Sequence, residues 1–279
     1  MQRDVQIGDI PQPLLDDIGT DLQHYLAPIF GLTDANQRDP LRLVGSGTFV
    51  KIDATYSILT AAHVWDASER LHAIGLALTA YESCFLIPRD MISVRRLRDK
   101  TSDEFGPDLA LLDIPAALVS RILAHKSVLD LSQQRGNFWT ESSKLNSGIW
   151  AVTGIAEGLS AIRERPEQHT FEADIHGRAF FCGIQHVHEH NGYDYLDAGA
   201  DMTTTGIPGS FGGVSGAGLW QIPLSLDKGG EISWNRKKNF RGVAFWESAV
   251  QEGRRVIRCH GPKSLFERAW QEWGLPTEL

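Results

Sequence analysis

Two hydrophobic patterns divide the chain, one helical and one typical of strands. Near the N-terminus, apolar residues recur at three- to four-residue spacing between polar ones, at Leu14, Ile18, Leu22, Leu26 and Ile29. This spacing predicts one amphipathic helix, which Pro28 and Gly31 end or bend. We expect this helix to pack on the main domain, and the alternative is a docking arm for a partner.

From residue 43 onward the apolar residues form short runs rich in branched and aromatic side chains, which predict strands. The predicted strands cover 43–52, 56–62, 71–80, 83–87, 108–114, 148–155, 171–176, 179–188, 193–198, 218–223, 240–246 and 254–259. Residues 115–123 are expected to form a short helix or a loop, and the polar stretch 133–147 to connect two lobes. A terminal helix is predicted after Pro262. Strands in two groups predict an all-β fold of two packed antiparallel barrels.

Composition and charge narrow the classes of function. The net charge is −8, which gives no electrostatic basis for binding nucleic acid. No run approaches the roughly 18 apolar residues of a membrane span, so no membrane association is predicted, and the N-terminus has no apolar signal core. Cys84, Cys182 and Cys259 lie far apart with no Cys-x-x-Cys pair, which predicts reduced thiols in a cytoplasmic protein.

Three short motifs follow one another along the predicted strands. The sequence Ile-Leu-Thr-Ala-Ala-His ends at His63, Pro-Asp-Leu-Ala-Leu-Leu contains Asp108, and Gly-Val-Ser-Gly-Ala-Gly contains Ser215. Upstream, Gly-Ser-Gly-Thr-Phe-Val begins at Gly45. In these motifs and in their order, the chain resembles the chymotrypsin-like (trypsin-like) serine protease family over residues 41–275.

The resemblance implies a fold and a division of the chain. The fold would be two packed six-stranded antiparallel barrels of the chymotrypsin type, with an N-terminal helical extension and a C-terminal helix. The expected boundaries are 1–40 for the extension, 41–135 for the first barrel, and 136–279 for the second barrel with the terminal helix.

The resemblance also implies a catalytic role for each motif residue. Ser215 would be the nucleophile, His63 the base that activates it, and Asp108 the carboxylate that orients and stabilises the imidazole. The N–H groups of Gly213 and Ser215 would form an oxyanion hole.

Each of these assignments has an alternative. His63 could instead be a buried structural histidine at the end of its strand. Asp108 could instead cap a turn. Asp103 and Asp113 are rival carboxylates. Asp113 lies five positions further along the same strand, and so points to its opposite face.

Departures from the family pattern bear on regulation and on substrate choice. Val214 precedes the serine, where zymogen-activated members have an aspartate that pairs with a freed N-terminus, so no activating cleavage is expected. Gly209 stands where the floor of the specificity pocket is often set, and it offers no carboxylate to Lys or Arg. Ala244, Phe245 and Trp246 resemble the strand that lines this pocket, and Trp246 is expected to narrow it for a small or apolar side chain.

His186, His188 and His190 share one strand face, a spacing that can hold a metal. We favour a polar strand end, and no metal or other cofactor is expected. The hypothesis is a cytoplasmic serine endopeptidase that cleaves a protein or peptide substrate through an acyl-enzyme. Similar cytoplasmic proteases imply an effector role in bacterial anti-phage defence, restrained by a regulatory protein partner or by a distorted resting site. The alternatives are a catalytically silent peptide-binding module of protease fold and an esterase-like hydrolase.

Overall fold

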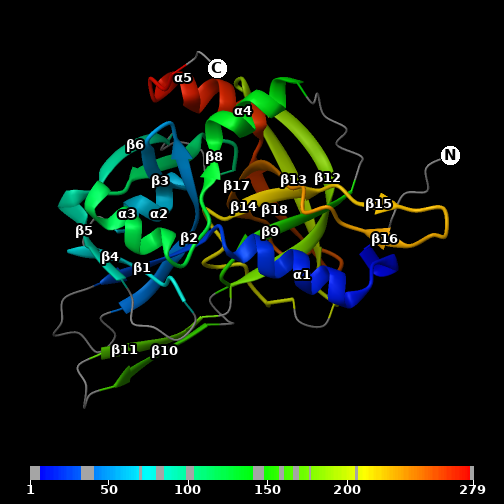
Figure 1. The fold of residues 1–279 in the computed structure, drawn as a ribbon, viewed down its shortest axis with the longest axis horizontal. Coiled ribbons are helices and arrows are strands. Elements are labelled where there is room, and N and C mark those ends of the chain that lie inside the picture. The colour runs from blue at the N-terminus through cyan, green and yellow to red at the C-terminus, as the bar shows by residue number, and fades with distance from the viewer. Residues whose placement is uncertain are drawn as a thin grey trace.

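A computed structural model describes residues 7–32, 41–68, 71–79, 85–98, 104–140, 148–156, 160–165, 170–175, 177–204 and 207–276 of the protein (Figure 1). The strands of its first sheet are Leu26–Leu32 (β1), Leu41–Ile52 (β2), Thr55–Thr60 (β3), Ala73–Leu76 (β4), Phe85–Pro88 (β5), Ser93–Arg98 (β6), Asp108–Asp113 (β7) and Leu129–Asp130 (β8). Their hydrogen-bonded order is β5-β4-β1-β2-β3-β7-β6, and β8 pairs with β2 in parallel.

The second sheet closes into a six-stranded barrel. Its strands are Ile149–Gly154 (β9), Arg178–His190 (β12), Tyr193–Asp201 (β13), Gly218–Ile222 (β14), Asn239–Glu247 (β17) and Arg254–His260 (β18). They close in the order β12-β13-β18-β17-β14-β9. Two short ribbons join Ser160–Arg165 (β10) with Thr170–Ile175 (β11), and Ser225–Leu226 (β15) with Ile232–Ser233 (β16).

A mostly β fold is confirmed, but among the described residues one closed six-stranded barrel is present where two were expected. The first sheet has eight strands and curls beside the barrel. Its two edge strands, β5 and β6, do not pair with each other in the described part of the chain. The first sheet also contains β1, which lies outside the boundaries 41–135 expected for the first barrel.

The N-terminal segment is partly strand, which corrects the expected helix. Helix α1 (Gln12–Gln23) ends well before Ile29, and β1 follows it. Pro28 lacks an amide N–H and disfavours helical backbone in the residue before it, so the segment extends. β1 pairs with both β2 and β4, and residues 26–32 therefore belong to the first sheet rather than to a separate extension of residues 1–40.

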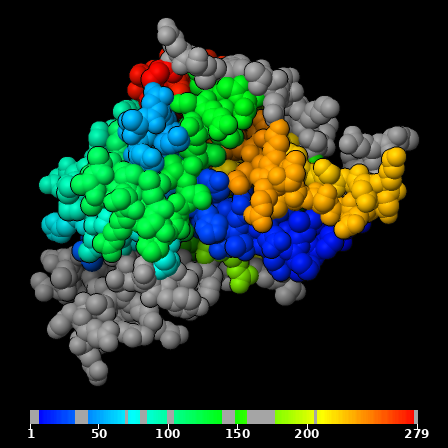
Figure 2. Space-filling model, in the orientation of Figure 1, coloured from blue at the N-terminus to red at the C-terminus, as the bar shows by residue number. Residues whose placement is uncertain are grey.

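Helix α1 packs on the closed barrel by its apolar face. Ile18 and Leu22 are fully buried, and the helix contacts β12 and β9. Lys238, just before β17, forms an ion pair with Asp21 across this contact. Figure 2 shows the surface of α1 (blue) adjoining the yellow to orange surface of the segment around β15 and β16. The expected packing of this helix is therefore present along its shorter observed length.

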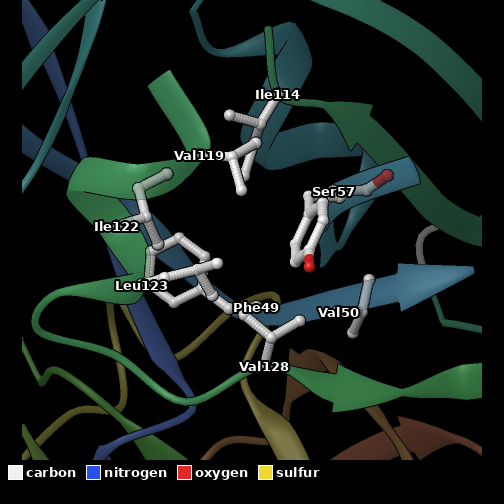
Figure 3. A pocket seen from close by; sticks show the side chains of 9 residues that line it. Phe49, Val50, Ser57, Ile114, Val119, Ile122, Leu123 and Val128 are labelled. Atoms are coloured by element: carbon white, nitrogen blue, oxygen red, sulfur yellow. The ribbon is translucent and has the colours of Figure 1, made fainter. Parts of the chain in front are cut away.

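The segment expected to be a short helix or a loop at 115–123 is helix α3 (Ala116–Leu123). Its apolar side chains, including Val119 and Ile122, face Phe49 of β2 across a narrow apolar pocket (Figure 3). Pro115 precedes the first residue of the helix, a position where its missing N–H costs no hydrogen bond. The helix thus covers one face of the first sheet.

Part of the polar stretch expected to connect two lobes is also helical, as α4 (Leu131–Thr140), and the rest lies outside the described residues. α4 lies beside the C-terminal helix predicted after Pro262, where the Phe138 and Phe266 ring centroids are 5.9 Å apart (Figure 1). The remaining helical segments are Ile7–Asp9 (η1), Ala62–Asp66 (α2), Arg89–Met91 (η2), Ser264–Ala269 (η5, a π-helix) and Trp270–Glu272 (α5). None of the described helices is long and apolar enough to cross a membrane.

Candidate active site

Strand pairing brings His63 and Asp108 together. β3 ends at Thr60, opposite Ala110 of β7, so helix α2 starts beside the first residue of β7, which is Asp108. The His63 backbone N–H donates to Asp108 Oδ1 at 2.8 Å, and the ring Nδ1 lies 2.6 Å from Asp108 Oδ2. With the carboxylate ionised, Nδ1 carries the donated proton, and the imidazole is held in one orientation.

The Asp108 carboxyl stays ionised at this position. Burial by itself raises the pKa of this carboxyl, but the hydrogen bonds and charge of His63, with the charge of Arg98, hold the pKa below its ordinary value. The rival Asp113 lies at the other end of β7, where its carboxylate accepts the Ser57 hydroxyl at 2.8 Å. Asp103 lies outside the described residues. In the described chain no group hydrogen-bonds to the other His63 nitrogen, Nε2, which is therefore able to accept a proton.

The glycine-rich turn that carries Ser215 packs against the end of β3. Gly216 has a φ of +87°, and a Cβ at this position would collide with the Thr60 hydroxyl and the Ser46 carbonyl. The Ser215 carbonyl accepts the Ser46 N–H at 2.8 Å. These contacts bring the turn to the strand end that leads into His63. The Ser215 hydroxyl, however, makes no hydrogen bond to His63 or to any other described group.

Two backbone N–H groups of the turn have no protein acceptor. Gly213 has a φ of +87°, and its carbonyl accepts the Ser46 hydroxyl at 2.7 Å. The same hydroxyl oxygen accepts the Ile155 N–H at 3.1 Å, which fixes the carbonyl direction of Gly213. Within the described chain, the N–H groups of Gly213 and Ser215 donate to no protein oxygen. Two such donors beside a serine can stabilise a developing oxyanion.

A cavity of about 230 Å³ lies beside Ser215. It is lined by Phe211, Gly212, Val214, Ser215, Ala244, Phe245, Trp246, Glu247 and Ile257. The structure therefore brings Ala244, Phe245 and Trp246 to the serine, as the resemblance implies. Gly209 is exposed and is not among the residues that line this cavity. The loop instead enters the cavity at Phe211, which is anchored edge-to-face on Phe180 with ring centroids 5.2 Å apart.

Glu247 lies in this cavity and was missed by sequence reasoning. Its carboxylate accepts the Phe211 N–H at 3.0 Å and the Ser210 hydroxyl at 3.2 Å, and it pairs with Arg255 at 2.6 Å. The charge is balanced within the protein, so the carboxylate is not free for a basic substrate side chain. No local motif signals this role, because Phe211 and Ser210 come from a distant loop.

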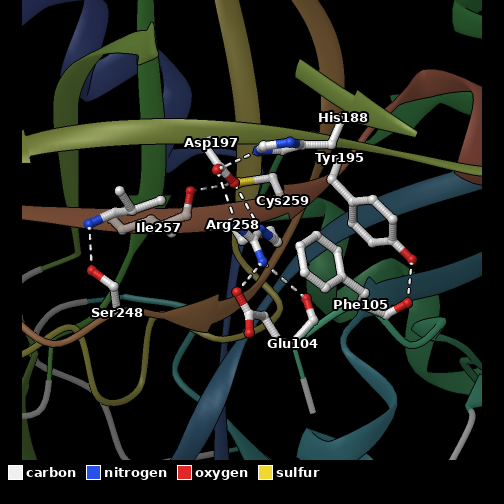
Figure 4. Close-up of polar contacts among 10 residues, drawn as sticks. Glu104, Phe105, His188, Tyr195, Asp197, Ser248, Ile257, Arg258 and Cys259 are labelled. Carbon is white, nitrogen blue, oxygen red and sulfur yellow. Dashed lines mark hydrogen bonds and ion pairs between the residues drawn. The ribbon is translucent and has the colours of Figure 1, made fainter. Parts of the chain in front are cut away.

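A network of ion pairs around the buried Arg258 and Asp197 supports the segment before β7 (Figure 4). Arg258 donates to both Asp197 oxygens at 2.8 and 3.1 Å and to Glu104 at 2.9 Å, and its guanidinium lies 4.2 Å from the Phe105 ring centroid. Burial by itself raises the pKa of Asp197, but Arg258 and His188 hold it below its ordinary value. The network joins the residues leading into β7 to the closed barrel.

The histidine-rich strand face is part of this network. His188 Nε2 lies 2.7 Å from Asp197 Oδ2, so one of the three histidines is held by a carboxylate that already binds arginine. Among the described residues no group of three His, Cys, Asp or Glu side chains is arranged to hold a metal. Cys182 and Cys259 are buried free thiols, and Cys84 lies outside the described residues.

Comparison with known proteins adds a distant structural similarity. No family model matches the sequence, and no curated protein matches it. A solved structure from work on the coupled folding and binding of the intrinsically disordered Sesbania mosaic virus VPg protein matches with a TM-score of 0.39 and 13% identity. The match covers 85% of this chain and 91% of that chain. At this score and identity the similarity carries no inference about function.

Proposed function

We propose that the chain is a serine endopeptidase that hydrolyses peptide bonds through an acyl-enzyme on Ser215. The observation that carries the proposal is the double contact of the Asp108 carboxylate with the backbone N–H and the Nδ1 of His63. This pair lies beside a turn whose serine is flanked by two N–H groups without protein acceptors. The β-barrel architecture is compatible with the chymotrypsin-like fold that the motifs resemble.

The proposed chemistry gives each group one task. His63 Nε2 takes the proton of the Ser215 hydroxyl as the oxygen attacks the peptide carbonyl carbon. Asp108 stabilises the imidazolium, and the N–H groups of Gly213 and Ser215 stabilise the oxyanion. His63 then protonates the leaving amine as the C–N bond breaks. A water molecule attacks the acyl-enzyme in the same way, which releases the acid and restores the serine.

The cavity beside Ser215 supports a small or apolar side chain at the cleavage site. Its volume of about 230 Å³ and its aromatic and aliphatic lining suit a side chain of that kind. Glu247 is already paired with Arg255, which argues against a preference for Lys or Arg. Trp246 lies in the lining, where a bulky ring limits the space.

The unbonded Ser215 hydroxyl supports regulation of the site. Catalytic hydrogen bonds are often long in resting sites and tighten when a ligand binds. We infer that the substrate or a regulatory protein partner completes the contact between Ser215 and His63. Val214 argues for such a switch over N-terminal clipping. The effector role in bacterial anti-phage defence stays a prediction from the resemblance alone.

A fluorophosphonate probe tests the nucleophile. The native protein, alone or with cellular partners, is expected to be labelled, and Ser215→Ala and His63→Ala are not. Ser210→Ala is the matched control, because Ser210 lies in the same loop and its hydroxyl contacts Glu247. Labelling of Ser215→Ala as strong as that of the native protein would contradict the assignment.

Peptide-library profiling tests the class of reaction. New N-termini that appear with the native protein and not with Ser215→Ala support an endopeptidase and report its preference. Ser215→Ala and His63→Ala are each expected to lower kcat on the order of 10⁶-fold. Ester hydrolysis without peptide cleavage would favour the esterase-like alternative, and peptide binding without labelling would favour the silent module.

A further inference from the structure

His260 is a buried histidine that the proposed chemistry leaves unused. It is the last residue of β18, it pairs with Tyr195 of β13 and Val243 of β17, and it is fully buried. Its Nδ1 has no hydrogen-bond partner among the described residues. A buried polar N–H without a partner costs free energy, and an apolar side chain would fill the same space without that cost. The imidazole therefore calls for another explanation.

The other ring nitrogen of His260 contacts Asp108. The Asp108 backbone N–H donates to His260 Nε2 at 3.0 Å, between residues that are 152 positions apart. Because a backbone N–H only donates, Nε2 is the unprotonated nitrogen and the ring proton is on Nδ1. The bond links the first sheet to the closed barrel, and the turn with Ser215 leads into β14 of that same barrel.

Aromatic rings hold this imidazole in one orientation. The Phe245 ring stacks on it at 4.2 Å with an interplanar angle of 21°, and the Tyr195 and Tyr193 rings lie 5.3 and 6.5 Å away. Burial lowers the pKa of His260 to about 3, while the charge of Asp108 acts in the opposite direction. The ring therefore stays neutral near neutral pH, and Nε2 continues to accept the Asp108 N–H.

We propose that His260 is a positioning residue, which holds the Asp108 backbone so that both carboxylate oxygens stay on His63. The two contacts measure 2.8 and 2.6 Å, and a rotation of the Asp108 backbone would break at least one of them. The inference rests on the proposed function. His260 acts through Asp108 and has no place among the reacting atoms. It also supports Phe245, which lines the cavity beside the serine.

Two variants distinguish the role of His260 Nε2 as a hydrogen-bond acceptor from the packing of the ring in the core. His260→Gln keeps an acceptor, because its amide oxygen can replace Nε2, whereas His260→Leu fills the core without one. Measured per titrated active site, kcat of His260→Leu is expected to fall about ten- to a hundredfold, with KM within about threefold. His260→Gln is expected to keep kcat within about fivefold of the native value. Titration of active sites removes the effect of any misfolded fraction.

The pH profile of kcat/KM supplies a readout that lost packing does not move. A displaced Asp108 carboxylate stabilises the His63 imidazolium less, so the midpoint of the acidic limb moves to lower pH in His260→Leu. The midpoint is expected to stay in place in His260→Gln. An unchanged midpoint in His260→Leu, with per-site kcat within about twofold of native, would overturn the positioning role.

A measurement without turnover keeps this inference separate from the proposed function. The proton between His63 Nδ1 and Asp108 is expected to give a strongly downfield NMR signal, which His63→Ala removes and thereby assigns. This signal should shift or vanish in His260→Leu and persist in His260→Gln. Absence of probe labelling would count against the proposed protease, whereas an unaltered signal in His260→Leu would count against His260 as a positioning residue.

Discussion

At the scale of single residues, Gly213 connects backbone conformation to the proposed chemistry. Its φ of +87° lies in the region that side-chain-bearing residues rarely adopt. A Cβ there would lie 2.7 Å from the Ile155 carbonyl oxygen and 2.6 Å from the Leu43 side chain. Only glycine fits, and the conformation leaves its N–H without a protein acceptor.

Gly213→Ala is therefore expected to lower both stability and activity. Strain at this φ should cost about 1–3 kcal/mol of unfolding free energy. Alanine keeps the backbone N–H, but the clash of its Cβ should displace this donor from the oxyanion, which should lower kcat by up to about 10²–10³-fold. Urea denaturation and peptide cleavage measure the two effects. Gly209→Ala is the matched control, because a Cβ at exposed Gly209 meets no atom within 4 Å. Equal stability of the two variants would contradict the strain at Gly213.

At the scale of elements, tertiary pairing decides between helix and strand in the N-terminal segment. The apolar positions 14–29 fit a helical stripe, yet β1 takes over from Leu26 because it pairs with strands on both sides. Nearly all of β1 is buried, which an amphipathic surface helix would not allow. The shorter helix α1 still buries Ile18 and Leu22 completely.

The burial of α1 predicts that this helix stabilises the whole chain. Leu22→Ala should lower the unfolding free energy by about 2–5 kcal/mol, because it leaves a cavity under the helix. Asp17→Ala, on the exposed face of the same helix, should change it by less than about 0.5 kcal/mol. Thermal and urea unfolding measure both. No effect of Leu22→Ala would instead favour a detachable docking arm.

At the scale of the whole molecule, polar contacts join the first sheet to the closed barrel around the candidate site. The Asp108 N–H reaches His260, Glu104 reaches Arg258, and the Tyr195 hydroxyl donates to the Phe105 carbonyl at 2.7 Å. All three contacts connect residues at or just before the start of β7 with the barrel. The geometry of the proposed site therefore depends on both sheets being folded.

The burial of His260 between these two sheets predicts a loss of stability in acid. Burial lowers the folded pKa of His260 to about 3 from an ordinary value of 6.5, so the unfolded chain binds the extra proton between these pH values. The unfolding free energy should fall as pH falls through that window, on the order of a few kcal/mol. Asp108 and Asp197, whose pKa values are held low, should add to the loss below an ordinary pKa of 3.8.

Urea unfolding at a series of pH values measures this loss. In His260→Leu, the fall of unfolding free energy at pH values above the ordinary carboxyl pKa should be absent. The further fall at lower pH, which comes from Asp108 and Asp197, should remain. His125 is exposed, so His125→Leu is the matched control and should leave the decline unchanged. A native stability that stays constant between about pH 6.5 and 4 would contradict a buried neutral His260.

Sequence reasoning reached the residues whose roles depend on local backbone. Strand periodicity predicted most of the strands in both sheets. In the first sheet it missed β1, β8 and β6, and the three arginines of β6 interrupt the apolar pattern. The motifs singled out His63, Asp108 and Ser215, and the structure brings His63 and Asp108 into contact. Positions such as a glycine turn or a strand end are encoded within a few neighbouring residues, and a single sequence can show them.

Only the tertiary structure decided what depends on partners far apart in the chain. It showed that β1 joins the first sheet, that the eight described strands of this sheet do not close into a six-stranded barrel, and that Gly209 stays outside the cavity. It also placed Glu247 and His260, whose roles come from contacts with residues 36 and 152 positions away. Such contacts leave no local signal, because burial and pairing arise only when distant segments pack together.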